Sequence, residues 1–368
     1  MSGSTFQRRG DGADERTPTS TEPLPDATRA KRLRGSIKRR LPRRVVLVLR
    51  FCFDQLELVR CFLHDYRRYR RHFGHPLRRE RRYLEAHLLR DAHRIEKGLA
   101  LPAPRPFFGA EVTERLVSIL EEHGAELDGS HARDFAQGAL RAYLDYHEGR
   151  DVPDDGHARR LETMATVLQG GDAAVGAPSG IVSVAARGGR TSVRRFARRP
   201  VAPTLLRAAV ARAIQAPSVC NRQHWRVHLF DGATKRRLLT LQNGNTGFGD
   251  DAPVLAVITS RLSSFLTPYE RYQQYVDGGM FAMCFLEALH ASGLGACPLN
   301  WSASVEQDRA FHALHVVPPE ESVIMYVVLG HYDREAAVVA ASPRMPVENF
   351  VRFHGETGAE GMVSGKPE

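Results

Sequence analysis

Two arginines and a serine alternate along the short segment Arg190-Thr-Ser-Val-Arg-Arg-Phe196. An extended chain projects every second side chain to the same side, so Arg190, Ser192 and Arg194 would face one way. Guanidinium groups and a hydroxyl are strong donors to phosphate oxygens. The spacing therefore predicts a phosphate clamp, with a solvated charge cluster before a helix as the alternative interpretation.

A loop rich in hydrogen-bonding residues follows about twenty residues later, Ala216-Pro-Ser-Val-Cys-Asn-Arg-Gln-His-Trp-Arg226. The apolar helical pattern over residues 205–214 must end at Pro217, because proline lacks a backbone N–H and clashes with the preceding turn. Residues 225–230 then alternate as a strand does. Such a helix-to-strand loop, offering the side chains of Ser218 and Asn221, is a common location for a ligand site.

The two segments together, Arg-x-Ser-x-Arg-x-Phe and Ala-Pro-Ser-x-x-Asn-x-Gln-x-Trp, resemble the start of the FMN-dependent nitroreductase family. Further matches follow in the family's order, down to about residue 353. They are residues 243–258, 275–290, 293–301, 330–331 and 342–346. The resemblance implies an α+β fold in which a mixed central sheet is flanked by helices, preceded here by an N-terminal helical extension.

The resemblance also implies roles for individual residues in binding FMN. The residues expected to hold its phosphate and ribityl chain are Arg190, Ser192, Arg194 and Arg344. Family members bind FMN at a homodimer interface, and the residues expected to reach the partner subunit's flavin are Pro217, Ser218 and Asn221. The residues expected along the flavin ring are Asn245 at its polar edge, and Pro298, Leu299 and Asn300, which would supply a backbone N–H near N5.

The chain departs from the family pattern at several of these positions. Many relatives carry an acidic residue and then a glycine where Asn300 and Trp301 stand, so Trp301 is expected to narrow the substrate face. His224 replaces a frequent proline. Ser342 stands where some relatives have a second cation, so the phosphate grip would rest on three arginines.

The resemblance implies an enzyme that transfers hydride from NAD(P)H through flavin N5 to an unidentified small-molecule acceptor. No side chain need act as an acid or base, because the flavin carries the chemistry. Two alternatives stay open: a specialised flavin-dependent dehydrogenase or dehalogenase, and a non-catalytic, membrane-associated partner in polysaccharide or envelope assembly. Cys220 with His224 is a weaker candidate, a thiol nucleophile and base that lacks an evident orienting group.

Charge separates the N-terminal arm from the remainder of the 368-residue chain. Residues 1–82 contain 22 Lys/Arg and 9 Asp/Glu, a net charge of +13, whereas the remainder has 30 and 33, a net charge of −3. The arm has no recognisable base-reading module, so no nucleic acid partner is expected. No signal peptide is evident, and the five cysteines show no metal-ligand spacing. These features predict a cytoplasmic protein.

Residues 45–63 are the most apolar part of the arm. Arg50, Asp54 and Glu57 fall at helical spacing, so they would form one polar stripe on an otherwise apolar helix. Arg60 adds a fourth charge, too many for a transmembrane helix. Because basic clusters flank this helix, residues 31–82 could lie on an anionic membrane surface; packing against the protein itself is the alternative.

The predicted domains are a disordered basic tail (1–35), a helical extension (36–170), a flexible linker (171–189), an FMN domain (190–354) and a disordered C-terminal tail (355–368). Helices are expected at residues 83–95, 112–123, 132–148 and 158–168 of the extension. Residues 93–98, His-Arg-Ile-Glu-Lys-Gly, resemble an extension of one nitroreductase-like subset, often met in polysaccharide contexts. A metal site formed by His87, Asp91, His93 and Glu96 is not expected, because His93 would lie about 240° around the helix from His87.

Overall fold

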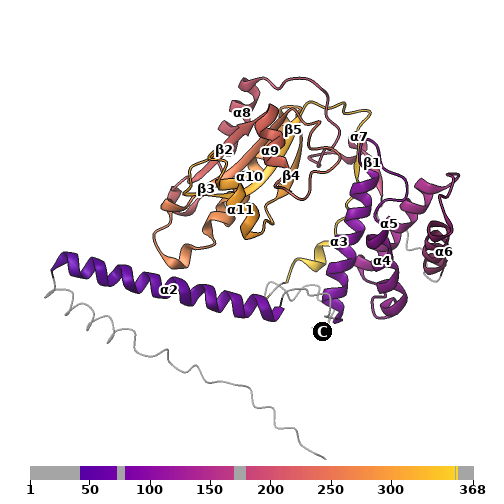
Figure 1. Cartoon of the computed structure of the whole chain (residues 1–368), viewed down its shortest axis with the longest axis horizontal. Coiled ribbons are helices and arrows are strands. Elements are labelled where there is room, and N and C mark those ends of the chain that lie inside the picture. The colour runs from indigo at the N-terminus through magenta and orange to yellow at the C-terminus, as the bar shows by residue number, and fades with distance from the viewer. Residues whose placement is uncertain (1–41, 73–78, 170–179, 353, 355–368) are drawn as a thin grey trace, which may run out of the picture. The chain divides into compact units, whose positions relative to one another are not determined.

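A computed structural model describes residues 42–72, 79–169, 180–352 and 354 (Figure 1). The chain divides into two compact units, residues 1–63 and residues 64–368. The described part of the first unit belongs to helix α2, and the second unit contains the remaining described elements. The two predicted tails, residues 1–35 and 355–368, lie outside the described residues.

Helix α2 (Arg43–His72) includes the predicted helix at residues 45–63 and continues beyond it. The expected polar stripe forms ion pairs, with Arg50 Nε 3.8 Å from Asp54 Oδ2 and Arg60 Nη1 3.4 Å from Glu57 Oε2. None of the residues in 43–72 is buried, and the side chain of Leu56 is 71% exposed. Among the described ranges, no helix has the length and apolarity needed to cross a membrane.

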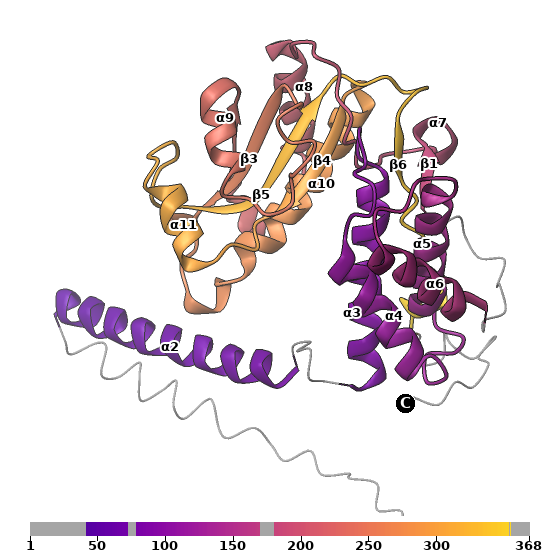
Figure 2. The same ribbon diagram turned by 45° about the vertical axis from the view of Figure 1, so that its right-hand side comes forward.

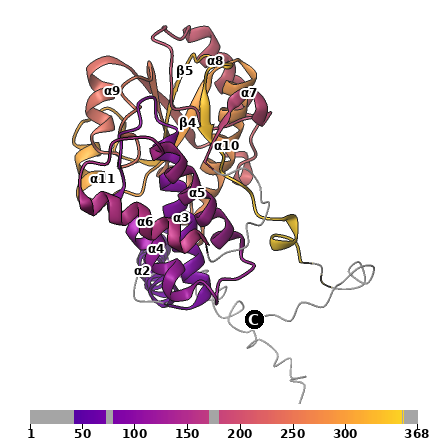
Figure 3. The ribbon, with the colours of Figure 1, turned by 90° about the vertical axis from the view of Figure 1, so that its right-hand side faces the viewer.

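The helical extension is a bundle whose four predicted helices are all present, each within a few residues of its expected bounds (Figure 3). They are α3 (Arg81–Leu99), α4 (Ala110–His123), α5 (His131–His147) and α6 (Asp155–Gln169). Ser130 caps α5 by accepting a hydrogen bond from Arg133 N at 3.2 Å. Leu88, Leu116 and Leu140 share one fully buried apolar core, so the amphipathic faces of the helices hold the bundle together.

The second part of the fold is a four-stranded sheet with strand order β2-β3-β5-β4 among the described strands. The strands are β2 (Trp225–Phe230), β3 (Val254–Arg261), β4 (Gly295–Asn300) and β5 (Glu321–Gly330). Their ladders are antiparallel, and the parallel component of the predicted mixed sheet is a bridge between Ser192 and Ala296. The predicted α+β class is confirmed.

Helices cover both faces of this sheet (Figure 2). In β3, Ala256 and Ile258 face α8 (Pro203–Ala213) and α10 (Gln273–Ala291), which pack on one side. Leu255 and Val257 face α9 (Gly232–Leu239) and α11 (Val305–His312) on the other side. Because side chains of a strand alternate between faces, a strand buried on both sides must be apolar throughout, as residues 254–258 are.

Part of the predicted flexible linker, residues 171–189, is ordered secondary structure, which corrects that prediction. Residues 170–179 lie outside the described residues, but β1 (Ile181–Ser183) and α7 (Val184–Arg187) follow. β1 pairs antiparallel with β6 (Val338–Ala340), and Val184 and Val339 form a small buried cluster. The glycines at both ends suggested a linker, whereas the structure uses Gly180, at φ 90°, for close approach to Ala142 of α5.

Candidate functional site

Residues 190–196, called the clamp segment below, run as an extended chain along the edge strand β4. Val193 N donates to Ala296 O at 3.0 Å beside the parallel bridge, and Val193 and Phe196 are buried in the core. A Cβ atom at Gly295 would lie 3.0 Å from Val193 Cβ, so glycine permits this close approach. As predicted from the sequence, Arg190, Ser192 and Arg194 all line one cavity; Thr191 lines it as well.

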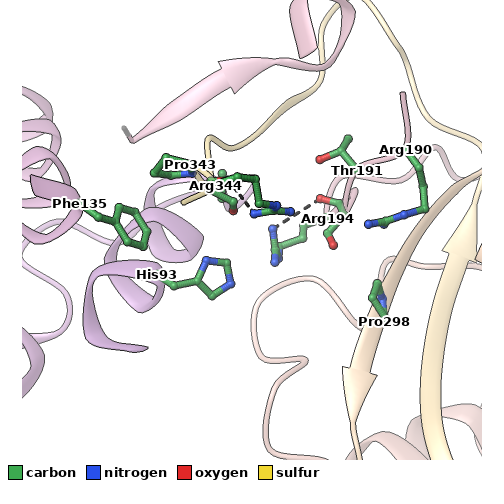
Figure 4. A pocket seen from close by; sticks show the side chains of 11 residues that line it. His93, Phe135, Arg190, Thr191, Arg194, Pro298, Pro343 and Arg344 are labelled. Atoms are coloured by element: carbon green, nitrogen blue, oxygen red, sulfur yellow. Dashed lines mark hydrogen bonds between the residues drawn. The ribbon is translucent and has the colours of Figure 1, made fainter. Parts of the chain in front are cut away.

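This cavity has a volume of about 460 Å³ and brings together five of the predicted site residues (Figure 4). These are Arg190, Ser192, Arg194, Pro298 and Arg344. Its other described lining residues are His93, Phe135, Thr191, Ala340, Ser342 and Pro343. The volume lies within the range typical of small-molecule and cofactor pockets.

The cavity is strongly cationic, because its described lining includes three arginines and no carboxylate. Arg190 Nε and Nη1 and Arg194 Nε are buried without a hydrogen-bond partner among the described residues. The nearest acidic partner of Arg190 is Glu287, whose Oε1 lies 3.9 Å from Arg190 Nε. A buried donor without an acceptor is costly, so the arrangement is suited to an anion with several oxygens, such as a phosphate.

Arg344 reaches the cavity from the returning C-terminal chain, as the resemblance implied. Its Nη1 donates to Ser342 O at 2.7 Å, and Ser342 adopts a left-handed backbone conformation at φ 44°. Glu96 of α3, fully buried, accepts from Ser342 N at 3.1 Å. The helical extension thus fixes the turn that carries the third arginine.

Strand β4 presents only one of its three predicted site residues to the cavity. Pro298 lines it, whereas the side chain of Leu299 is buried in the core on the other face. Asn300 lies at a separate small recess, and its carbonyl accepts from Gln242 Nε2 at 3.0 Å. The sequence led us to expect that Trp301 narrows the substrate face, but Trp301 does not line this cavity. Its ring stacks on Tyr326, and its indole N–H donates to Asp308 at 3.1 Å.

Asn245 lies outside the arginine cavity, at a different pocket of about 670 Å³. Its side-chain amide donates to the carbonyl oxygens of Leu239 at 2.8 Å and of Gln242 at 2.6 Å. These are backbone acceptors at and just after the end of α9, where a helix leaves carbonyls without intrahelical partners. Asn245 therefore closes the turn after α9 in this structure.

The loop containing Pro217, Ser218 and Asn221 also lies away from the described lining of the arginine cavity. Ser218 Oγ accepts from Gln223 N at 3.0 Å, and Asn221 Oδ1 accepts from Gln223 Nε2 at 3.1 Å. Asn221 has a left-handed backbone at φ 53°, a conformation that asparagine tolerates better than most residues. The predicted reach into a partner's site stays a prediction, since the structure describes one chain.

His224 anchors this loop to α10. Its imidazole is fully buried between Asp277 Oδ2, which accepts from Nε2 at 3.0 Å, and Ser260 Oγ, which lies 2.7 Å from Nδ1. Asp277 Oδ2 also accepts from Val219 N at 2.9 Å. The alternative that Cys220 and His224 form a thiol and base pair is wrong. Cys220 is exposed, whereas the imidazole of His224 is buried and bonded to Asp277 and Ser260.

The residues weighed as metal ligands in α3 have other partners. Asp91 accepts from Arg115 Nε at 3.0 Å and from Arg90 Nε at 3.1 Å, and Glu96 accepts from Gly180 N at 3.0 Å. Within the described part of the chain, no three His, Cys, Asp or Glu side chains are grouped as a metal site.

Four lining residues of the arginine cavity were missed by reasoning from the sequence: His93, Phe135, Thr191 and Ala340. Thr191 stands inside the clamp segment and is found once that segment is known to border a cavity. His93 and Phe135 belong to α3 and α5, so only their long-range packing brings them to the site. The one available signal was the run at residues 93–98, which stood out without an assigned chemistry.

Comparisons with known proteins give one matching family model and several similar proteins. Residues 188–244 match the nitroreductase family. A "NADH dehydrogenase" of Thermus thermophilus is 38% identical over 78 residues, which span 21% of this chain and 38% of that relative. The chain thus matches less than half the length of this relative.

Among solved structures, a putative nitroreductase from Desulfovibrio desulfuricans in complex with FMN is 21% identical, with a TM-score of 0.39. The match covers 45% of this chain and 93% of that one. An FMN-dependent nitroreductase from Clostridium difficile is also 21% identical, with a TM-score of 0.38, and covers 45% of this chain and 96% of that one.

Proposed function

We propose that the protein is an FMN-dependent oxidoreductase that uses NAD(P)H, which the match of residues 188–244 to the nitroreductase family supports. The observation that carries the proposal is the convergence of Arg190, Arg194 and Arg344 on one cavity, with buried guanidinium N–H groups that have no acceptor among the described residues. A phosphate monoester supplies the oxygens that these donors lack.

The roles proposed for the side chains are binding and orientation. Arg190 and Arg194 hold the phosphate from the clamp segment, and Arg344 closes on it from the C-terminal chain. Pro298 provides an apolar surface at the β4 side of the cavity. When bound, the flavin supplies hydride transfer between NAD(P)H and an acceptor, while the protein supplies orientation and electrostatics.

The direct test is whether the protein binds FMN and accepts electrons from a nicotinamide cofactor. We expect flavin absorption in the purified protein, or quenching of FMN fluorescence on titration with the apoprotein. Anaerobic addition of NADH or NADPH should then bleach the bound flavin and show which reductant is preferred. Protein that neither carries nor takes up FMN contradicts the proposal.

We further propose that the protein is a homodimer, as expected from the resemblance. Helix α10 is apolar around most of its circumference, and one face of it is exposed. The exposed side chains follow helical spacing: Tyr272, Tyr275, Val276, Met280 and Met283. A helix that is apolar all round is normally buried, so this face is suited to covering by a second copy.

We expect light scattering to report a dimer, and Val276→Glu to shift it towards the monomer with loss of FMN. A carboxylate placed in a closely packed apolar interface loses its hydration without gaining a partner. Val305→Glu is the matched control, because Val305 is also exposed and lies on α11. A wild-type monomer with full FMN occupancy contradicts the dimer.

The basic arm is proposed to bind anionic membrane surfaces through α2, whose apolar side chains are exposed. Full-length protein should sediment with vesicles containing anionic lipid at low salt, and less so at high salt, because each Lys or Arg near the surface contributes about 1 kcal/mol that salt screens. Phe51→Glu with Leu56→Glu should reduce sedimentation, and Leu266→Glu, equally exposed outside α2, should not. Sedimentation that does not depend on lipid charge contradicts membrane binding by the basic arm and favours packing of α2 against the protein itself.

A further inference from the structure

The segment at residues 93–98, near the end of α3, contacts the chain beyond residue 180 through three side chains, those of His93, Glu96 and Lys97. His93 lines the arginine cavity, and in Figure 4 its imidazole points into the same space as the guanidinium groups of Arg194 and Arg344. His93 and Lys97 are four residues apart, so they lie on one face of the helix. His93 therefore forms part of the wall of the proposed cofactor site, and Lys97 lies outside the described lining of the cavity.

The carboxylate of Glu96 contacts two backbone segments beside the cavity and also lies near His93. Its carboxylate accepts from Gly180 N at 3.0 Å and from Ser342 N at 3.1 Å, and its Oε2 lies 3.8 Å from His93 Nδ1. The first contact holds the start of β1, and the second holds the turn before Arg344. When both ring nitrogens are protonated, Nδ1 faces the Glu96 carboxylate and Nε2 can donate toward the cavity.

Lys97 fastens the same face of α3 to the chain after α9. Its Nζ donates to Gly244 O at 2.6 Å and lies 5.7 Å from the ring centre of Phe248. Burial lowers the pKa of Lys97, and the positive charge of Arg194 lowers it further. Gly98 follows, where a Cβ atom would lie 2.2 Å from the Phe108 ring, so the chain needs glycine to pack there.

We propose that His93 is a fourth phosphate-binding residue of the cofactor site, supplied by the helical extension, with Glu96 as its positioning residue. This inference rests on the proposed FMN function. It accounts for His93 standing among three arginines in a cavity whose described lining has no carboxylate. It also assigns the extension a direct role in holding the phosphate, in addition to any role in localisation.

The test compares two flavins that differ only by the phosphate, FMN and riboflavin, by fluorescence quenching. We expect His93→Ala to weaken FMN binding about tenfold, because a hydrogen bond to a charged group is lost, and to leave riboflavin binding unchanged. His93→Arg should restore preference for FMN over riboflavin, because a guanidinium also donates to phosphate. His87→Ala is the matched control, since His87 stands on α3 outside the described cavity lining.

The outcomes separate this inference from the proposed function. An unchanged FMN to riboflavin preference in His93→Ala overturns the role of His93, while FMN binding by the wild type still supports the function. Equal losses for both flavins also overturn it, because they indicate damage to the fold rather than loss of a phosphate contact. A wild type that binds neither flavin overturns both proposals.

Discussion

Arg190→Ala is expected to weaken FMN binding about ten- to a hundredfold, because a charge-assisted hydrogen bond to a phosphate contributes about 1.5–3 kcal/mol. We expect the largest loss at Arg190, because two of its buried nitrogens have no hydrogen-bond partner among the described residues, whereas Arg194 has one such nitrogen. Fluorescence titration of the apoprotein with FMN measures the change. Arg190→Lys should recover only part of the affinity, because an ammonium group lacks the planar fork of the guanidinium.

Arg198→Ala is the matched control for Arg190→Ala. Arg198 lies eight residues further along the chain, is exposed, and is outside the described lining of the cavity. Its removal changes net charge by the same amount and should leave FMN affinity nearly unchanged. If both variants lose affinity equally, the effect comes from long-range charge and the clamp geometry is wrong.

Asp277→Ala is expected to lower the free energy of unfolding by about 2–5 kcal/mol, because each buried donor left without an acceptor costs about 1–3 kcal/mol. The substitution removes the acceptor of both His224 Nε2 and Val219 N. It also leaves Gln273 Nε2, which donates to Asp277 Oδ1 at 2.6 Å, without that partner. Denaturant unfolding followed by circular dichroism measures the loss.

Two further variants test the cause of that loss. Asp277→Asn keeps the side-chain volume and one carbonyl acceptor, so it should cost less than Asp277→Ala. Glu162→Ala removes an exposed carboxylate from the middle of α6, where surface substitutions usually change stability by less than about 0.5 kcal/mol. An Asp277→Ala protein as stable as the Glu162→Ala protein contradicts the proposed anchoring of the loop.

Local pattern was sufficient to predict the four helices of the bundle, strand β2 and the grouping of Arg190, Ser192 and Arg194 at one cavity. Strand β2 has the predicted bounds, residues 225–230, because its alternation is uninterrupted. This grouping was predictable because Arg190, Ser192 and Arg194 are close neighbours in one extended segment. Pro217 likewise stands beyond the end of α8, as its chemistry requires.

Positions that depend on distant partners could not be predicted in the same way. Pro298 and Leu299 lie on opposite faces of β4. The pairing of β4 with β5 and the helices covering each side decide which residue faces the cavity. Trp301 was placed by its stacking on Tyr326, twenty-five residues away in the sequence. His93 reaches the arginines only because Glu96 binds the backbone of Ser342, and no local pattern encodes a contact over that separation.

The pairing of β1 with β6 has a consequence for the order in which the protein matures on the ribosome. Ile181 pairs with Ala340, so all four strands of the larger sheet are synthesised between these two strands. The bundle of α3 to α6 emerges before the larger sheet, yet Glu96 cannot bind Ser342 N until residue 342 has been made. Arg344 follows directly, so the cavity gains its third arginine only after the larger sheet has been synthesised, and a chain that stops before residue 344 lacks part of the proposed phosphate site.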